Sequence, residues 1–161
     1  MPMSYDAPPD AIDQELVLKF FWKYSTFECE LKRRGFLKEG ESWAKPDWKK
    51  FVEHLHRKGG FKVRMVQRLA EAIEALKAAP PRRQVVKDGQ LGWEDLSPKP
   101  GDAHVLKLLM MVRNNLFHGG KYLDGHVKEI ARDRGLLRAA LTILEACFEL
   151  LQSEPGAQMR T

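Results

Sequence analysis

Apolar residues recur at helical spacing along much of this chain. In the first such stretch, which we expect to form a helix from Ala11, one apolar face is spaced by three and four residues: Val17, Phe20, Tyr24, Phe27 and Leu31. Three cations, Lys32 to Arg34, fall in its predicted last turn, where they complement the helix dipole. Gly35 then supplies a C-terminal stop. This stretch is therefore predicted to be an amphipathic helix that packs against other helices.

The same spacing predicts three more long helices and one short helix. The long ones follow the apolar residues within 66–76, 105–112 and 137–151, and the short one spans 46–56. Pairs of helix breakers separate them: Gly59-Gly60, Pro80-Pro81 and Gly119-Gly120. Asp102 is positioned to cap the third long helix, and the last helix is expected to begin at Val127 or soon after it.

The segment between Pro81 and Gly101 differs from its helical neighbours. Val85-Val86 and Leu91 to Trp93 flank Asp88-Gly89, a pair that readily adopts the positive φ angles of a tight turn. We therefore predict a small β-hairpin near residues 84–94, inserted between two helices. The role of this insertion does not follow from its residues.

Together these elements predict an all-α, four-helix-bundle-like domain with one extra short helix and the hairpin insertion. Residues 11–152 are expected to form this single helical domain. Three of the nine prolines lie in the first ten residues, so 1–10 is predicted to be a flexible arm, and 153–161 a flexible tail.

Bulk composition narrows the protein class. No apolar stretch approaches the roughly 20 residues of a membrane-spanning helix, and the start of the chain has no signal-peptide pattern, so we expect a cytoplasmic protein without membrane partners. The 27 Lys and Arg residues exceed the 22 Asp and Glu residues, which gives a net charge of +5. This charge suits a polyanionic partner such as RNA without establishing one.

Metal and cofactor chemistry are not expected. Cys29 and Cys147 lie in helical stretches without a CxxC partner or a nearby histidine pair, so they are predicted to be reduced and buried. No set of Asp, Glu, His or Cys residues has ligand spacing either.

The segment Val112–Gly120 combines three polar side chains, Arg113, Asn114 and His118, with a pair of glycines at a predicted helix end. Asn114 and His118 are four residues apart and share a helix face, so the amide can orient the imidazole. Arg113 and His118 differ by about 140° around an ideal helix. Either the helix breaks before His118, or a second copy of the chain completes the site.

This segment resembles the HEPN superfamily, in which Arg is followed after four to six residues by His, often with a polar residue just after the Arg. The family pattern also often has a Glu, three residues and a Lys-Arg pair near the end of the first helix. Glu28, Lys32 and Arg33 fit that second pattern. The resemblance covers roughly residues 11–151, except for 81–101.

The resemblance implies a metal-independent endoribonuclease, such as a toxin or defence effector, with a composite site in a homodimer. Neutral His118 suits the general base, and the planar guanidinium of Arg113 suits stabilisation of phosphate charge. The partner's His118 would then supply the general acid. An antitoxin protein would be a further partner of a toxin. Toxins silenced by adenylylation carry a tyrosine where this chain has Gly120, so that regulation is not expected.

Other interpretations stay open. The domain could be a non-catalytic dimeric HEPN module that binds RNA or a protein, or a purely structural helical protein. Arg113 and His118 could simply be cations at a helix end. Glu28 is expected to form an ion pair with Arg113 or Lys32 more readily than to act in catalysis. The four tryptophans are expected to pack locally, because they are too scattered in sequence to form a base-stacking platform.

Overall fold

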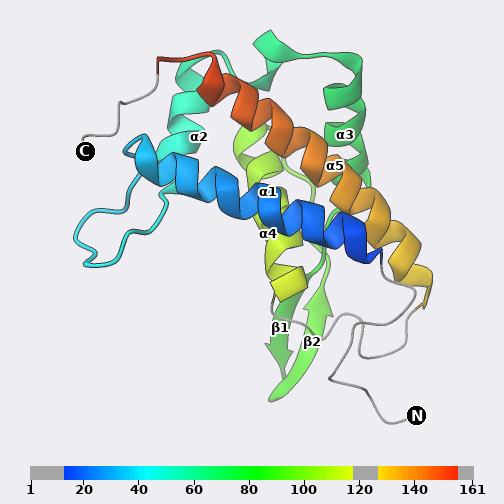
Figure 1. Cartoon of the computed structure of the whole chain (residues 1–161). Coiled ribbons are helices and arrows are strands. Elements are labelled where there is room, and N and C mark those ends of the chain that lie inside the picture. Colours follow the sequence, from blue (N-terminus) through cyan, green and yellow to red (C-terminus); the bar gives the residue numbers. More distant parts are fainter. Residues whose placement is uncertain (1–12, 118–126, 156–161) are drawn as a thin grey trace.

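The computed structural model describes residues 13–117 and 127–155, with the side chains of α5 described from Asp133 onward. These residues form a mostly helical fold with one two-stranded antiparallel sheet (Figure 1), which confirms the predicted helical class and the hairpin. The helices are α1 (Gln14–Arg33), α2 (Trp48–Arg57), α3 (Gln67–Ala78), α4 (Asp102–Phe117) and α5 (Val127–Gln152). The remaining elements are a short 3-10 helix, η1 (Phe61–Arg64), and the strands β1 (Arg83–Lys87) and β2 (Gln90–Glu94).

Helix α1 buries the predicted apolar face but begins later than expected. The side chain of Asp13 accepts a hydrogen bond of 3.0 Å from the backbone amide of Leu16, and this cap starts the helix at Gln14 rather than at Ala11. At the other end Gly35 has a φ of 87°, and the amide of Phe36 donates to the carbonyl of Leu31. Gly35 therefore ends the helix as the sequence predicts.

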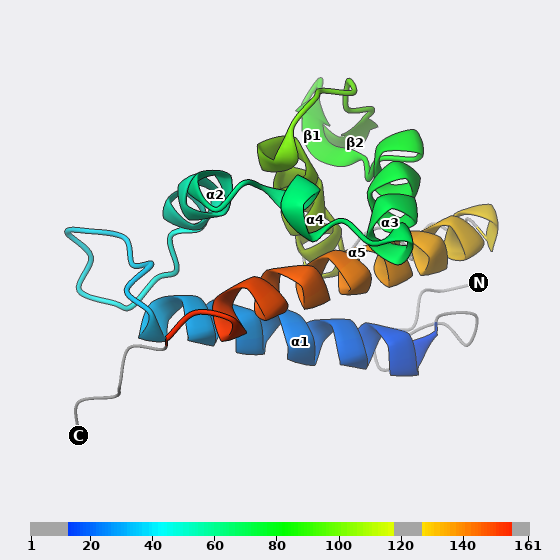
Figure 2. The same cartoon turned by 90° about the horizontal axis from the view of Figure 1, so that it is seen from above.

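Helix α5 is the centre of the fold, and α1 runs beside it in the same direction (Figures 1 and 2). Near the start of both helices, the guanidinium of Arg134 lies 3.6 Å from the carboxylate of Asp13. Further along, the ammonium of Lys23 lies 3.1 Å from the carboxylate of Glu145. The two α1 partners and the two α5 partners are separated by nearly the same number of residues and follow the same order along their helices. The two helices are therefore parallel.

Helix α3 packs on another side of α5 in the opposite direction (Figure 2). Arg68, in the first turn of α3, pairs with Glu145 at 3.0 Å, and Arg64 donates to the hydroxyl of Ser153 just beyond the end of α5. Thus α5 is covered by α1, α3 and α4 along much of its length. Within the described residues, no helix is long and apolar enough to cross a bilayer.

The short helix α2 begins at Trp48 rather than at Pro46. Asp47 caps it by accepting a hydrogen bond of 3.1 Å from the amide of Lys50, while Pro46 pairs with Leu37 in an isolated β-bridge. The predicted start was wrong because the preceding chain uses Pro46 to close the loop after α1, and Asp47 is the better cap.

The hairpin forms around the predicted turn and adjoins the C-terminal end of α4 (Figure 1). Asp88 and Gly89 have φ angles of 50° and 73°, and the strands pair from Arg83 with Glu94 through to the turn. The buried side-chain amide of Asn115 in α4 donates a hydrogen bond of 2.8 Å to the carbonyl of Arg82. This contact fixes the hairpin to the helix that carries the candidate site.

An aromatic cluster joins α1, α2 and α5 in the core. The ring of Phe27 lies edge-on to Phe51 at 5.2 Å and to Phe148 at 5.1 Å between centroids.

The two cysteines differ in burial. Cys147, which precedes Phe148 on α5, is fully buried as expected, whereas Cys29 is only half-buried. The first two residues of the predicted tail are anchored, because Ser153 bonds to Arg64 and Glu154 pairs with His54.

Candidate functional site

Arg113 lies on the last turns of α4 and is held between aromatic rings. Its guanidinium carbon lies 4.4 Å from the centre of the Phe117 ring and 5.9 Å from the centre of the Tyr24 ring. One guanidinium nitrogen donates a hydrogen bond of 3.1 Å to the side-chain oxygen of Asn114. No described carboxylate lies within ion-pair distance of Arg113, so its positive charge is held in place by rings and an amide.

Tyr24 connects this end of α4 with the middle of α1. The Tyr24 ring is buried and stacks on Trp48 at 5.4 Å between centroids. Burial raises the pKa of the Tyr24 phenol far above its usual value, the charge of Glu28 raises it further, and the charge of Arg113 lowers it. Tyr24 therefore lies against Arg113 of the second motif and one helical turn before Glu28 of the first motif.

The predicted ion pair of Glu28 does not form. Within the described residues, Glu28 is half-buried and has no cation within ion-pair distance, neither Arg113 nor Lys32. Arg113 is instead turned against the rings of Tyr24 and Phe117. Periodicity predicts Tyr24 in the apolar core, and the structure confirms its burial. Its position one turn before Glu28 on the same helix face is the sequence signal for its place near the motif.

Lys32 and Arg33 lie further along α1, about 12 Å or more beyond Tyr24 at the rise of an α-helix. Lys32 is half-buried and Arg33 is exposed, and no described side chain forms an ion pair with either. The ion pair at this end of α1 joins Arg34 to Glu30 at 2.6 Å. Arg113 thus lies against Tyr24, one turn before Glu28 on α1, whereas Lys32 and Arg33 lie further along that helix.

His118 lies outside the described residues, so its predicted role stays a prediction. The helix before it is continuous from Arg113 through Phe117. Asn114, which was predicted to orient His118, accepts the hydrogen bond from Arg113 in the structure. The amide oxygen of Asn114 therefore fixes the arginine of the motif.

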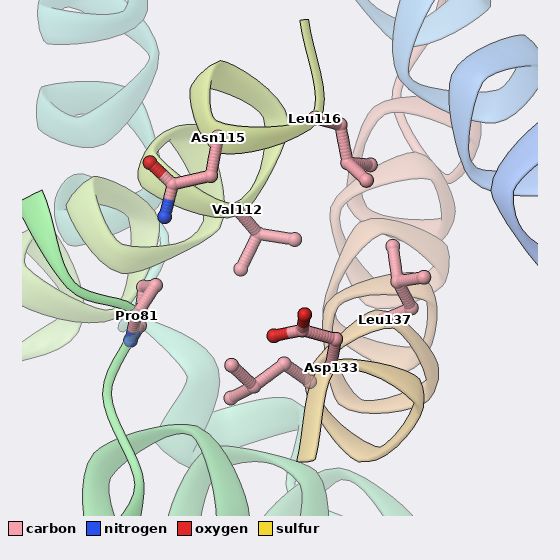
Figure 3. Close-up of a pocket in the computed structure, with 7 residues that line it drawn as sticks. Pro81, Val112, Asn115, Leu116, Asp133 and Leu137 are labelled. Atoms are coloured by element: carbon pink, nitrogen blue, oxygen red, sulfur yellow. The ribbon is translucent and has the colours of Figure 1, made fainter. Parts of the chain in front are cut away.

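A small cavity lies between the last turns of α4 and the first described side chains of α5 (Figure 3). Asn115 from α4 and the buried carboxylate of Asp133 from α5 line it together with Pro81 and apolar side chains of both helices. The side-chain amide of Asn115 donates its hydrogen bond to the carbonyl of Arg82 and so fixes the hairpin to α4. The sequence alone assigns no role to Asn115 or Asp133, because their meeting depends on how α4 and α5 pack.

The expectation that all the tryptophans pack locally is wrong for two of them. Trp48 packs on Tyr24 and Phe27, but Trp22 on α1 and Trp43 in the loop after α1 are largely exposed. Helical periodicity places Trp22 on the outward side of α1, away from the buried face that starts at Phe20.

Among the residues that the structure describes, no three His, Cys, Asp or Glu side chains are grouped as metal ligands would be. In comparisons with protein-family models, with curated proteins and with solved structures, no match to this chain was found.

Proposed function

We propose that the chain is a HEPN-type, metal-independent endoribonuclease whose site contains Arg113, Asn114 and His118. The observation that carries this proposal is the contact of the two motif segments at Tyr24. Arg113 of the second motif lies against the Tyr24 ring, and Tyr24 precedes Glu28 of the first motif by one turn of α1. Segments far apart in sequence that resemble one family's pattern are thus neighbours in space.

The environment of Arg113 supports its proposed role. Its guanidinium is half-buried, is oriented by Asn114 and two rings, and has no described carboxylate in ion-pair contact. A cation held in this way can bind a phosphate without first breaking an ion pair. A planar guanidinium also matches two phosphate oxygens at once, which suits the doubly charged transition state of RNA cleavage.

The proposed reaction breaks the bond between phosphorus and the 5′ oxygen. His118 as general base takes the proton of the ribose 2′-hydroxyl, and the 2′ oxygen attacks the adjacent phosphorus. A general acid, proposed to be His118 of a second copy, protonates the 5′ oxygen as it leaves. The products are one strand that ends in a 2′,3′-cyclic phosphate and one that begins with a 5′-hydroxyl.

The composite site in a homodimer remains part of the proposal. The proposed reaction needs both a general base and a general acid, and the motif of one chain carries a single histidine, His118. A second copy is then the more direct way to bring a second imidazole to the scissile phosphate.

The test is to measure RNA cleavage and RNA binding on the same variants in the same buffer. We expect His118→Ala to lose roughly 10²- to 10⁴-fold in cleavage while keeping its RNA affinity and thermal stability. Arg113→Lys keeps the charge but loses the planar fork, so its turnover should fall more than its affinity. End-group analysis should detect the cyclic phosphate.

Two exposed residues serve as matched controls. His56→Ala and Arg138→Lys make the same chemical changes at exposed positions on α2 and α5, and both should cleave RNA at the wild-type rate. Full cleavage by His118→Ala would overturn the site. If the wild-type protein binds RNA but cleaves none of a broad set of substrates, the chain is a binding module.

A further inference from the structure

Four large apolar side chains on α1 and at the end of α4 are exposed, and one of them, Phe117, lies against Arg113. Leu18, Phe21 and Trp22 on α1 are 65%, 40% and 70% exposed, and Phe117 at the end of α4 is 49% exposed. The rings of Phe21 and Phe117 lie 5.4 Å apart between centroids and are inclined by 35°. We call these four residues, three aromatic and one aliphatic, the aromatic face.

Residues 18, 21 and 22 are three and four positions apart, so they form one outward stripe of α1. The buried residues Phe20, Tyr24 and Phe27 occupy the other side of the same helix. Contact between Phe21 and Phe117 extends the stripe from α1 to α4. The face is therefore continuous, although its residues come from two elements distant in sequence.

A positive charge lies at the edge of this face. The guanidinium carbon of Arg113 is 4.4 Å from the centre of the Phe117 ring, and no described carboxylate forms an ion pair with it. Lys19, next to Leu18 on α1, is also exposed and has no described ion-pair partner. Exposed rings beside cations are complementary to a ligand that carries both flat apolar groups and negative charges.

We propose that the aromatic face binds single-stranded RNA, with bases stacked on Phe117 and Trp22 and a backbone phosphate at Arg113. This inference rests on the proposed function and specifies the strand state of its substrate. Bases in a duplex are stacked on one another, so only an unpaired strand can place them on protein rings. The stacking would anchor the strand beside the arginine that stabilises the scissile phosphate.

The size of the face favours a strand over a second copy of the chain as its occupant. A stable protein interface buries about 800 Å² on each partner. Large apolar and aromatic side chains contribute about 150–250 Å² each when fully buried, and these four are already partly covered. The face alone falls short of a dimer interface, whereas two or three bases need only a few rings.

The experiment measures RNA affinity in a His118→Ala background, so that the substrate is not consumed. A labelled single-stranded RNA and the corresponding duplex are titrated with the parent protein and with Trp22→Ala and Phe117→Ala. One base stacked on an aromatic ring is worth about 1–3 kcal/mol, so each substitution should weaken binding of the single strand by about 5- to 150-fold. Binding of the duplex should be weaker in the parent and should change little in Trp22→Ala, which leaves the contact between Phe117 and Arg113 in place.

Trp43→Ala is the matched control, because Trp43 is 79% exposed but lies in the loop between α1 and α2. The RNA affinity of Trp43→Ala should equal that of the parent. Trp22→Phe should retain most of the affinity for the single strand, because it keeps an aromatic ring. Thermal unfolding and light scattering on each variant establish that fold and oligomeric state are unchanged.

The outcomes separate this inference from the proposed function. If Trp22→Ala and Phe117→Ala bind the single strand as the parent does, the aromatic face is not an RNA site, whether or not the wild type cleaves RNA. If light scattering shows that Trp22→Ala and Phe117→Ala form smaller assemblies than the parent while their RNA affinity is unchanged, the face is a protein interface and the inference is wrong. If they lose RNA affinity and the wild type proves inactive, the inference stands and the proposed catalysis fails.

Discussion

The guanidinium of Arg113 lies 5.9 Å from the centre of the Tyr24 ring, and this contact joins the end of α4 to the middle of α1. The same guanidinium carbon lies 4.4 Å from the centre of the Phe117 ring. The arginine of the candidate site is therefore oriented by residues of two helices. Its position depends on how those helices pack.

Tyr24→Phe should reduce the loss of stability at alkaline pH. Burial is the main cause that raises the pKa of the Tyr24 phenol above its usual value of about 10, so the folded state favours the neutral form. The stabilisation is fully present below pH 10 and is lost as pH rises above it toward the folded-state pKa. Urea unfolding at pH 8 and pH 11 measures this, and the free energy of unfolding should fall less in Tyr24→Phe than in wild type. Equal falls in both proteins would show that Tyr24 is not the responsible group.

RNA cleavage should continue in the presence of excess EDTA. In the proposed mechanism Arg113 carries out the charge stabilisation that a divalent ion would otherwise provide, and His118 transfers the protons. The rate is measured before and after chelation, with dialysed protein and metal-free RNA. Activity that disappears with EDTA and returns with Mg²⁺ or Mn²⁺ would contradict the mechanism.

The protein should be a symmetric dimer in solution, with the Arg113 and His118 side chains of the two copies facing one shared site. We expect this because the proposed site draws one histidine from each of two chains. Static light scattering at micromolar concentration should give twice the mass of one chain, and specific activity should fall on dilution below the dissociation constant. His118→Ala should keep the dimer mass, since it removes a reacting group rather than the whole interface. A strict monomer that cleaves RNA would exclude the composite site.

Gly60→Ala should destabilise the fold more than Gly40→Ala. Both glycines have a positive φ, 71° at Gly60 and 73° at Gly40, and Gly60 also has a ψ of −169°, a combination that essentially only glycine adopts. Alanine at Gly60 therefore carries a backbone strain of about 1–3 kcal/mol. A β-carbon at Gly60 would also collide with the carboxylate of Asp102, whereas the space at Gly40 is open. That carboxylate accepts a hydrogen bond of 3.0 Å from the amide of Phe61.

Displacing the Asp102 carboxylate would leave the Phe61 amide without its acceptor, at a further cost of about 1–3 kcal/mol. Urea unfolding of both variants gives the comparison. If Gly60→Ala and Gly40→Ala lose the same free energy of unfolding, the contact between Asp102 and Phe61 does not stabilise the junction of α2 and α4.

Much of the local structure was predictable from the sequence, because it depends on neighbours along the chain. Periodic apolar residues identified the buried face of α1, and Asp88-Gly89 identified the hairpin turn. The exact starts of α1 and α2 were missed by a few residues, since Asp13 and Asp47 were not recognised as caps. The polar cluster Arg113-Asn114 was also visible in the sequence, as was the motif of Glu28.

Only the tertiary structure decided which of these residues meet. Tyr24 belongs to the apolar pattern of α1 by spacing, yet packing brings it to Arg113 and makes it the contact between two motifs. Asn115 holds the hairpin, and Trp22 with Phe117 forms an exposed face. Periodicity determines which side of a helix is apolar, because that depends on 3.6 residues per turn. Which side chains of two helices touch depends on their crossing and relative rotation, and those are set by the whole core.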